Sequence, residues 1–118
     1  MSDLSFAKVA GFGSLDYYKI YGFYEEPLMF LCVNAKGKKF LLSRIGEKTA
    51  KWLAVEISER RMNQLEKGRI EMREPFINPE NGYTYIIGSE KEPYEVSLIS
   101  PENITDDMFP FPDELLLK

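Results

Sequence analysis

The sequence predicts an α+β domain: an antiparallel β-sheet meander with a short helix, a turn and a second helical turn inserted after the fourth strand. The first observation is a series of aromatic and β-branched runs joined by short turns, at 17–24, 28–33, 39–45 and 52–57. The second is a change to helical spacing from Ser58 to Phe76, interrupted by Gly68. The third is the return of two strand-like runs, 83–87 and 94–99.

The first fifteen residues are predicted to form a loop or a poorly formed edge segment. Gly11 and Gly13 are spaced like half of a phosphate-binding fingerprint. Such a fingerprint needs a third glycine, a preceding apolar strand and a following helix, and the sequence predicts none of them here. The two glycines therefore indicate a loop rather than a nucleotide site.

The first predicted strand, 17–24, is unusually rich in tyrosine. Strict alternation would place Tyr17 and Tyr21 on one face, and Tyr18 and Tyr24 on the other. Four tyrosines on one strand exceed what the core of a small domain needs. Tyrosine has an apolar body and a polar tip, and it is a frequent anchor of interfaces. Tyr17, Tyr21 and Tyr24 are therefore candidate interaction residues.

The next strands are expected to build the centre of the sheet. Residues 28–33 are apolar on both faces, which is typical of a strand covered on each side. Trp52, Leu53, Val55 and Ile57 are predicted to be largely buried in one strand. Cys32 is the single cysteine, and its apolar neighbours indicate a packed thiol rather than a nucleophile.

Ser58 is the predicted N-cap of the inserted helix, because its hydroxyl can accept an N–H of the first turn. The third residue after it is Arg61 rather than Glu or Gln, so the reciprocal capping box is missing. Gly68 is placed to end the helix in a left-handed conformation. Pro75 disfavours helical geometry at Glu74 and is predicted to stop the second helical turn.

Arginines surround this insertion and allow two readings. Arg60, Arg61 and Arg73 could hold a phosphate beside an aromatic pocket. Glutamates alternate with them, however, and such mixtures usually form weak pairs on an exposed surface. On that reading Arg60 and Arg61 are exposed, whereas Arg73 points its stem inward. The three arginines are kept as candidate interaction residues.

The residues that usually carry catalysis are scarce. The chain has no histidine, which removes the usual general base near neutral pH and the commonest metal ligand. With one cysteine, no structural zinc site can form. The sequence therefore predicts no catalytic residue, no cofactor and no metal site, and a protein that is not an enzyme. Carboxylate-only chemistry would depend on Glu102, Asp106 and Asp107, which are expected to be solvated.

Length and charge bound the remaining possibilities. The 118 residues form one predicted domain, 1–118, in which 100–118 is an acidic, proline-containing C-terminal segment. From Glu90 onward the chain has eight acidic and two basic residues, which disfavours nucleic acid. The segment either keeps the protein soluble or attracts a basic partner.

No run of apolar residues is long enough to span a bilayer, and no secretory signal is visible, so a cytoplasmic protein without membrane contact is expected.

One part of the sequence resembles an uncharacterised family of small bacterial and bacteriophage α+β domains. The resemblance covers about residues 17–88 and is strongest from Ser58-Glu-Arg-Arg through Leu65, Gly68 and Ile70 to Arg73-Glu-Pro-Phe76. It implies a shared fold and a bacterial or phage setting, and it implies no mechanism. Pro75 departs from the helix former expected there.

Two functions follow from these observations as expectations. The first is a non-enzymatic module that binds another protein, such as an inhibitor, an immunity factor or a regulator. The missing catalytic residues, the surplus tyrosines and the acidic end favour it. The alternative is a protein that binds a small ligand, a nucleotide or another phosphate, through Arg60, Arg61 and Arg73. A homo-oligomer is compatible with either.

Overall fold

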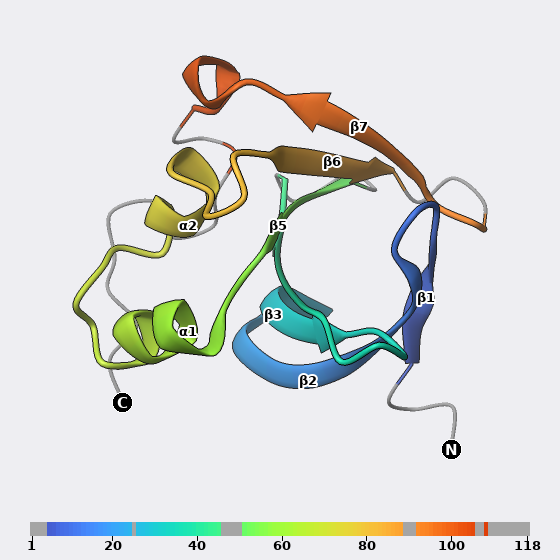
Figure 1. Ribbon diagram of the computed structural model, residues 1–118, viewed down its shortest axis with the longest axis horizontal. Helices are drawn as coiled ribbons and strands as arrows, with labels where there is room; N and C mark the ends of the chain where they lie inside the picture. Colours follow the sequence, from blue (N-terminus) through green and yellow to red (C-terminus); the bar gives the residue numbers. More distant parts are fainter. Residues whose placement is uncertain (1–4, 25, 46–50, 89–91, 106–107, 109–118) are drawn as a thin grey trace.

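In the computed structural model, residues 5–24, 26–45, 51–88, 92–105 and 108 are described. They form one antiparallel sheet whose seven strands follow one another in chain order (Figure 1). Two short α-helices follow the fifth strand. The elements are β1 Ser5–Val9, β2 Gly13–Tyr24, β3 Glu26–Val33, β4 Lys39–Arg44, β5 Lys51–Glu56, α1 Glu59–Glu66, α2 Glu74–Ile77, β6 Thr84–Gly88, β7 Glu95–Ile99 and the 3₁₀ turn η2 Pro101–Asn103.

The sheet curls until its two ends meet (Figure 1). Val9 of β1 forms a parallel bridge with Tyr94, just before β7. The Tyr94 N–H donates to the Lys8 carbonyl at 2.8 Å, and the Ala10 N–H donates to the Tyr94 carbonyl at 2.9 Å. The antiparallel meander predicted from the sequence is therefore confirmed, and the structure adds its closure.

The inside of the curl is filled by one face of the strands. Phe30 and Cys32 of β3 and Leu42 of β4 are fully buried there. Aromatic side chains close the space between them, with the Phe6 ring 5.1 Å from Phe30 and 5.3 Å from Trp52. Cys32 is buried as the sequence predicts. Trp52, in contrast, keeps part of its surface exposed.

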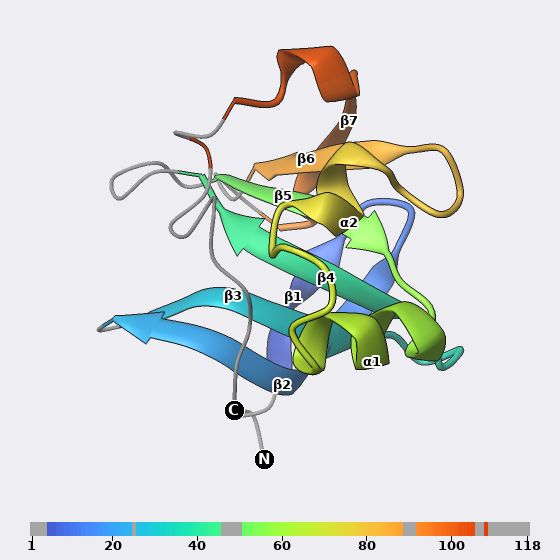
Figure 2. The same cartoon turned by 90° about the vertical axis from the view of Figure 1, so that its left-hand side faces the viewer.

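The outside of the curl carries a second core under the helices. Leu31, Leu41 and Leu53 point outward from three adjacent strands and are fully buried. Leu65 of α1 and Phe76 of α2 cover them, and Figure 2 shows both helices lying on this side of the sheet. Two apolar layers on opposite faces explain why the central strands are apolar at nearly every position.

For the first fifteen residues the predicted alternatives are a loop or a poorly formed edge segment. The edge position is confirmed, because β1 lies at the edge of the sheet and its pairing has an irregularity between Ser5 and Ala7, whereas among the described residues of this segment a loop is found only at 10–12. Residues 5–9 and 13–16 pair as an antiparallel hairpin at one end of the sheet. Ala7, Val9 and Leu15 are buried within it. Interior partners and the bonds to Tyr94 order a segment whose local pattern is weak. The helical insertion consequently follows the fifth strand rather than the fourth.

The predicted grouping of Tyr17 with Tyr21 on one sheet face is also wrong. Tyr17 packs into the interior, whereas Tyr21 packs against the outer core. The pairing of β2 with β3 shifts register between Tyr17 and Lys19. A β-bulge adds one residue to the strand, so the side chains beyond it exchange faces.

Pro75 also acts differently from the prediction, because it lies in the first turn of α2 and helps to begin that helix. A proline is tolerated there, since the first helical N–H groups have no partner within the helix. It is buried together with Phe76. Between the helices Gly68 has a φ of 69°, in the left-handed region.

Some predicted features lie outside the described residues. These are Asp106, Asp107, residues 109–118 of the acidic segment, and the side chain of Tyr24. Glu102 is described and is exposed in η2. Of the helices that the structure describes, none has the length and apolar character needed to cross a bilayer.

Candidate functional site

The candidate residues from the sequence are distributed over different parts of the molecule. The Tyr17 ring lies 5.7 Å from that of Phe6 and 5.0 Å from that of Phe30, inside the curl. The Tyr21 hydroxyl donates a hydrogen bond of 2.6 Å to Glu66 at the end of α1. The structure does not bring these two tyrosines together.

Glu66 receives two donors from β2. Lys19 Nζ lies 2.9 Å from the same carboxylate oxygen that the Tyr21 hydroxyl contacts. Burial first, and then the hydrogen bond to Glu66, raise the pKa of Tyr21 well above its usual value. The hydrogen bond to Glu66 also raises the pKa of Lys19. This cluster fastens α1 to the sheet, and its polar groups are directed at one another.

The arginines do not converge on one site either. Arg60 is exposed. Arg61, predicted to be exposed, has only 16% of its side chain exposed; it donates to the Asn78 carbonyl at 2.6 Å and lies 3.8 Å from Glu74. Arg73 donates to Glu71 at 3.0 Å. Two of the three candidate arginines therefore have carboxylates beside them.

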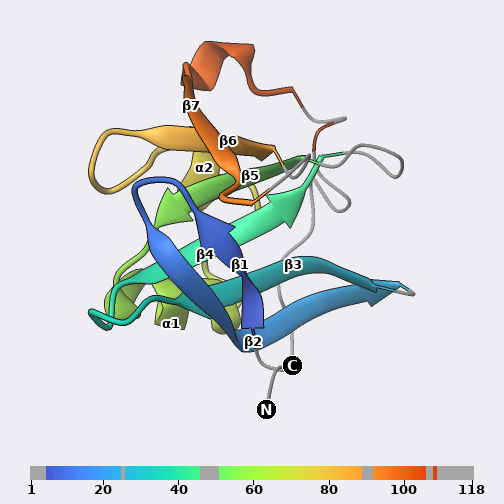
Figure 3. The same cartoon turned by 90° about the vertical axis from the view of Figure 1, so that its right-hand side faces the viewer.

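An open concavity of about 470 Å³ lies at the mouth of the curl, where the β1–β2 turn approaches β6 and β7. Figure 3 shows the β1–β2 hairpin on the side of the molecule that carries this closure. Residues 10–12 line the concavity from the turn. Residues just before β6, near its start and within β7 complete the lining: Tyr83, Tyr85, Val96, Ser97 and Leu98.

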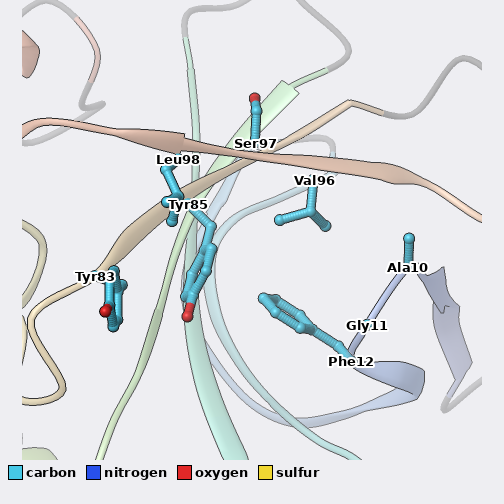
Figure 4. A pocket seen from close by; sticks show the side chains of 8 residues that line it. All are labelled: Ala10, Gly11, Phe12, Tyr83, Tyr85, Val96, Ser97 and Leu98. Atoms are coloured by element: carbon cyan, nitrogen blue, oxygen red, sulfur yellow. The ribbon is translucent and has the colours of Figure 1, made fainter.

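The walls of the concavity are aromatic and firmly packed. The Phe12 ring stacks on Phe40 at 4.5 Å and meets Tyr85 edge-on at 5.1 Å. Figure 4 shows Phe12, Tyr85 and Val96 directed toward one another, with Ser97 pointing away. The Asn34 side chain donates to the Phe12 carbonyl at 3.1 Å, which holds the turn in place. These contacts fix the positions of the Phe12 and Tyr85 rings in the wall.

The rim of the concavity carries two exposed apolar side chains. Leu98 is 63% exposed and Tyr83 is 54% exposed. No charged side chain belongs to the lining. Within the part of the chain that the structure describes, no three potential metal ligands lie together. The chemistry available here is apolar and aromatic contact with a hydroxyl from tyrosine.

The sequence analysis did not find this surface. Val96 and Leu98 alternate with polar neighbours in a recognisable strand, and this is the only local signal. Phe12 lies more than seventy positions earlier, in the segment predicted to be a loop. The two parts meet only because the sheet closes on itself.

Comparison with known protein families gives a match over most of the chain. A model of a family of unknown function, DUF6575, matches residues 5–109. This is consistent with the resemblance to an uncharacterised family, and it covers the closure and the concavity as well as the central strands. Neither the curated proteins nor the solved structures contain a significant match.

Proposed function

We propose that this chain, which belongs to the DUF6575 family of unknown function, is a non-enzymatic module that binds another protein through the concavity between the β1–β2 turn and β7. The proposal names the surface as well as the class of function. It assigns no chemical step to any residue.

The observation that carries the proposal is the clustering of exposed apolar side chains. Large hydrophobic side chains exposed among the described residues are Tyr18, Ile20, Tyr83 and Leu98. The last two lie together at the rim of one concavity. Continuous apolar surface on a small domain often marks an interaction site, and aromatic side chains are frequent anchors.

The proposed setting is the bacterial cytoplasm. There the module, encoded by the bacterium or by its phage, would act as an inhibitor, an immunity factor or a regulator. Such a protein needs a rigid surface and no catalytic group. The helix–turn–helical-turn insertion has a structural role in this proposal, since α1 and α2 cover the outer core away from the concavity.

A peptide selection tests the proposal. A random peptide library displayed on phage is panned against the immobilised protein, and enriched peptides are synthesised for direct binding measurements. The double variant Tyr83→Asp/Leu98→Asp places charge on the rim. Its matched control, Tyr18→Asp/Ile20→Asp, places the same charges on the other exposed apolar pair.

We expect selected peptides to bind the wild type and the control variant, and to bind the rim variant at least about tenfold more weakly. Thermal melts of both variants establish that each is folded. A selection that enriches no peptide contradicts the proposal. So do peptides whose affinity is unaffected by the rim variant.

A further inference from the structure

We infer that the partner supplies an extended, basic segment that adds to the open edge of β7 as a further strand and places apolar side chains in the concavity. This inference rests on the proposed function and names its binding mode. Main-chain pairing would provide affinity, and the concavity would provide selectivity.

The direction of the main-chain groups in β7 supports this mode. The N–H and the carbonyl of Tyr94 both point toward β1, because they bond with Ala10 and Lys8. Along a strand, main-chain groups face one edge at every second residue. The groups of Val96 and Leu98 therefore face the same edge as those of Tyr94, whereas Glu95, Ser97 and Ile99 face β6.

That edge is unoccupied within the part of the chain that the structure describes. β1 accompanies β7 only at Val9 and Tyr94, because the chain turns back through residues 10–12. A Cβ added to Gly11 would meet nothing within 4 Å. Neighbouring strands lie about 4.8 Å apart, which is the distance from β7 at which an added strand would run.

The side chains of β7 define the pattern that such a segment needs. The Val96 and Leu98 side chains point toward the concavity, whereas the Ser97 side chain points away from it (Figure 4). Alternation along the strand puts Glu95 on the same side as Ser97. A paired strand places its own side chains alternately next to these two sets. The segment should therefore carry apolar residues toward Phe12 and Tyr85, and polar residues on the opposite side.

Charge selects a basic segment over an acidic one. Glu92, Glu95 and Glu102 are exposed, and residues 92–105 contain no lysine or arginine. Lys8 of β1 is exposed, and its main-chain N–H donates to the Glu92 carboxylate at 3.3 Å. A second copy of the chain would bring two acidic strands together, which disfavours self-pairing through β7.

The test uses fluorescein-labelled peptides about eight residues long and fluorescence anisotropy. One peptide alternates lysine with valine, and its matched control alternates glutamate with valine. Two variants of one residue separate main-chain pairing from side-chain contact. Leu98→Ala shortens the side chain and keeps the N–H, whereas Leu98→Pro also removes the N–H that faces the open edge.

Proline suits this position structurally because an edge strand tolerates it where the N–H faces outward. Leu98 is mostly exposed, so neither variant opens a large cavity. Thermal melts of both variants check their folding. If Leu98→Pro is unfolded, main-chain pairing is tested from the side of the peptide instead. The lysine–valine peptide is then methylated on its main-chain nitrogens, so that it cannot donate hydrogen bonds to β7, and its binding to the wild type is measured.

We expect the lysine–valine peptide to bind at least about tenfold more tightly than the glutamate–valine peptide, and the preference to shrink as salt is added. Leu98→Pro, or the methylated peptide, should weaken binding about tenfold more than Leu98→Ala does. Equal affinity for both peptides, equal effects of the two substitutions, or no binding of either peptide would overturn the inference. Phage-selected peptides that still require Tyr83 and Leu98 would then leave the proposed function intact.

Discussion

The two oxygens of the Glu80 carboxylate accept hydrogen bonds from Ser58, which lies twenty-two positions earlier in the chain. Oε1 accepts the Ser58 main-chain N–H at 2.8 Å, and Oε2 accepts its hydroxyl proton at 2.7 Å. The same hydroxyl accepts the Arg61 N–H at 3.2 Å, as an N-cap does. In a capping box the N–H of the cap is bonded by a glutamate three residues later. Here a turn between α2 and β6 supplies that carboxylate.

Replacing Glu80 should therefore weaken the start of α1. We expect Glu80→Ala to lower the free energy of unfolding by about 1 kcal/mol, as the loss of a capping interaction typically does. The matched control is Glu102→Ala, which removes an exposed carboxylate from η2. Urea unfolding followed by circular dichroism measures both. Equal losses of stability in the two variants would mean that the contact between Glu80 and Ser58 makes no net contribution to the free energy of unfolding.

The hydroxyl of Tyr21 should contribute more to the free energy of unfolding than the hydroxyl of Tyr18 does. Tyr21→Phe removes the 2.6 Å hydrogen bond to Glu66, a partly buried acceptor with 18% of its side chain exposed. Hydrogen bonds to charged groups contribute about 1.5–3 kcal/mol, and partial exposure favours the lower end. Tyr18→Phe changes an exposed ring and should be near neutral. A stability difference below about 0.5 kcal/mol between the variants would contradict this role.

Stability should fall as the solution becomes alkaline. Burial raises the pKa of Cys32 above its ordinary value of 9.0, and burial raises the pKa of Tyr21 above 10.0. Above those ordinary values the unfolded chain releases both protons while the folded chain keeps them. High pH therefore favours unfolding, and the stabilisation present below about pH 9 is lost progressively above it.

Urea midpoints between pH 8 and pH 11 check this dependence. The double variant Cys32→Ala/Tyr21→Phe removes both groups and should flatten the curve. Its starting stability will be lower because of the lost contacts, so the slope is the informative quantity. An unchanged slope would show that other groups control the alkaline loss.

Arg60 and Arg61 are adjacent on α1 but should differ in their effect on stability. Arg61 donates to the Asn78 carbonyl and lies near Glu74, whereas Arg60 is exposed. Arg61→Ala should lower the free energy of unfolding by about 1 kcal/mol, and Arg60→Ala by less than about 0.5 kcal/mol. The exposed position that the sequence predicts for both arginines is thereby revised for Arg61. Chemical denaturation of the single variants measures the difference.

Cys32 should be inert in the folded protein. Its side chain is fully buried, and the raised pKa keeps it a thiol at neutral pH. The thiolate is the reactive form, so labelling requires opening of the sheet. Modification by a chromogenic disulfide reagent should be at least about a hundredfold slower without denaturant than with it. Rapid labelling of the native protein would contradict the interior position of β3.

Much of the sheet could be predicted from the sequence because its central strands have strong local patterns. The run from Leu28 to Val33 is apolar on both faces, and the structure gives β3 a packed layer on each side. Ser58 identified the start of α1 by its chemistry alone. These features depend on side chains within a few residues of one another, so periodicity and capping reveal them.

Contacts between distant segments decided the features that the local patterns do not reveal. The strand β1 has a weak local pattern and is ordered by Phe6 packing on Trp52 and by the bonds to Tyr94. A β-bulge in β2 places Tyr21 on the opposite face from Tyr17, and the local periodicity of the sequence does not predict this bulge.

The concavity depends most completely on tertiary structure. Phe12 and Leu98 lie at opposite ends of the chain and share a surface only because the curled sheet brings its first and last strands together. The sequence determined which residues form strands, since that preference is local. The closure of the sheet determined which of those residues line the concavity, since that depends on the sum of all the pairings between the strands.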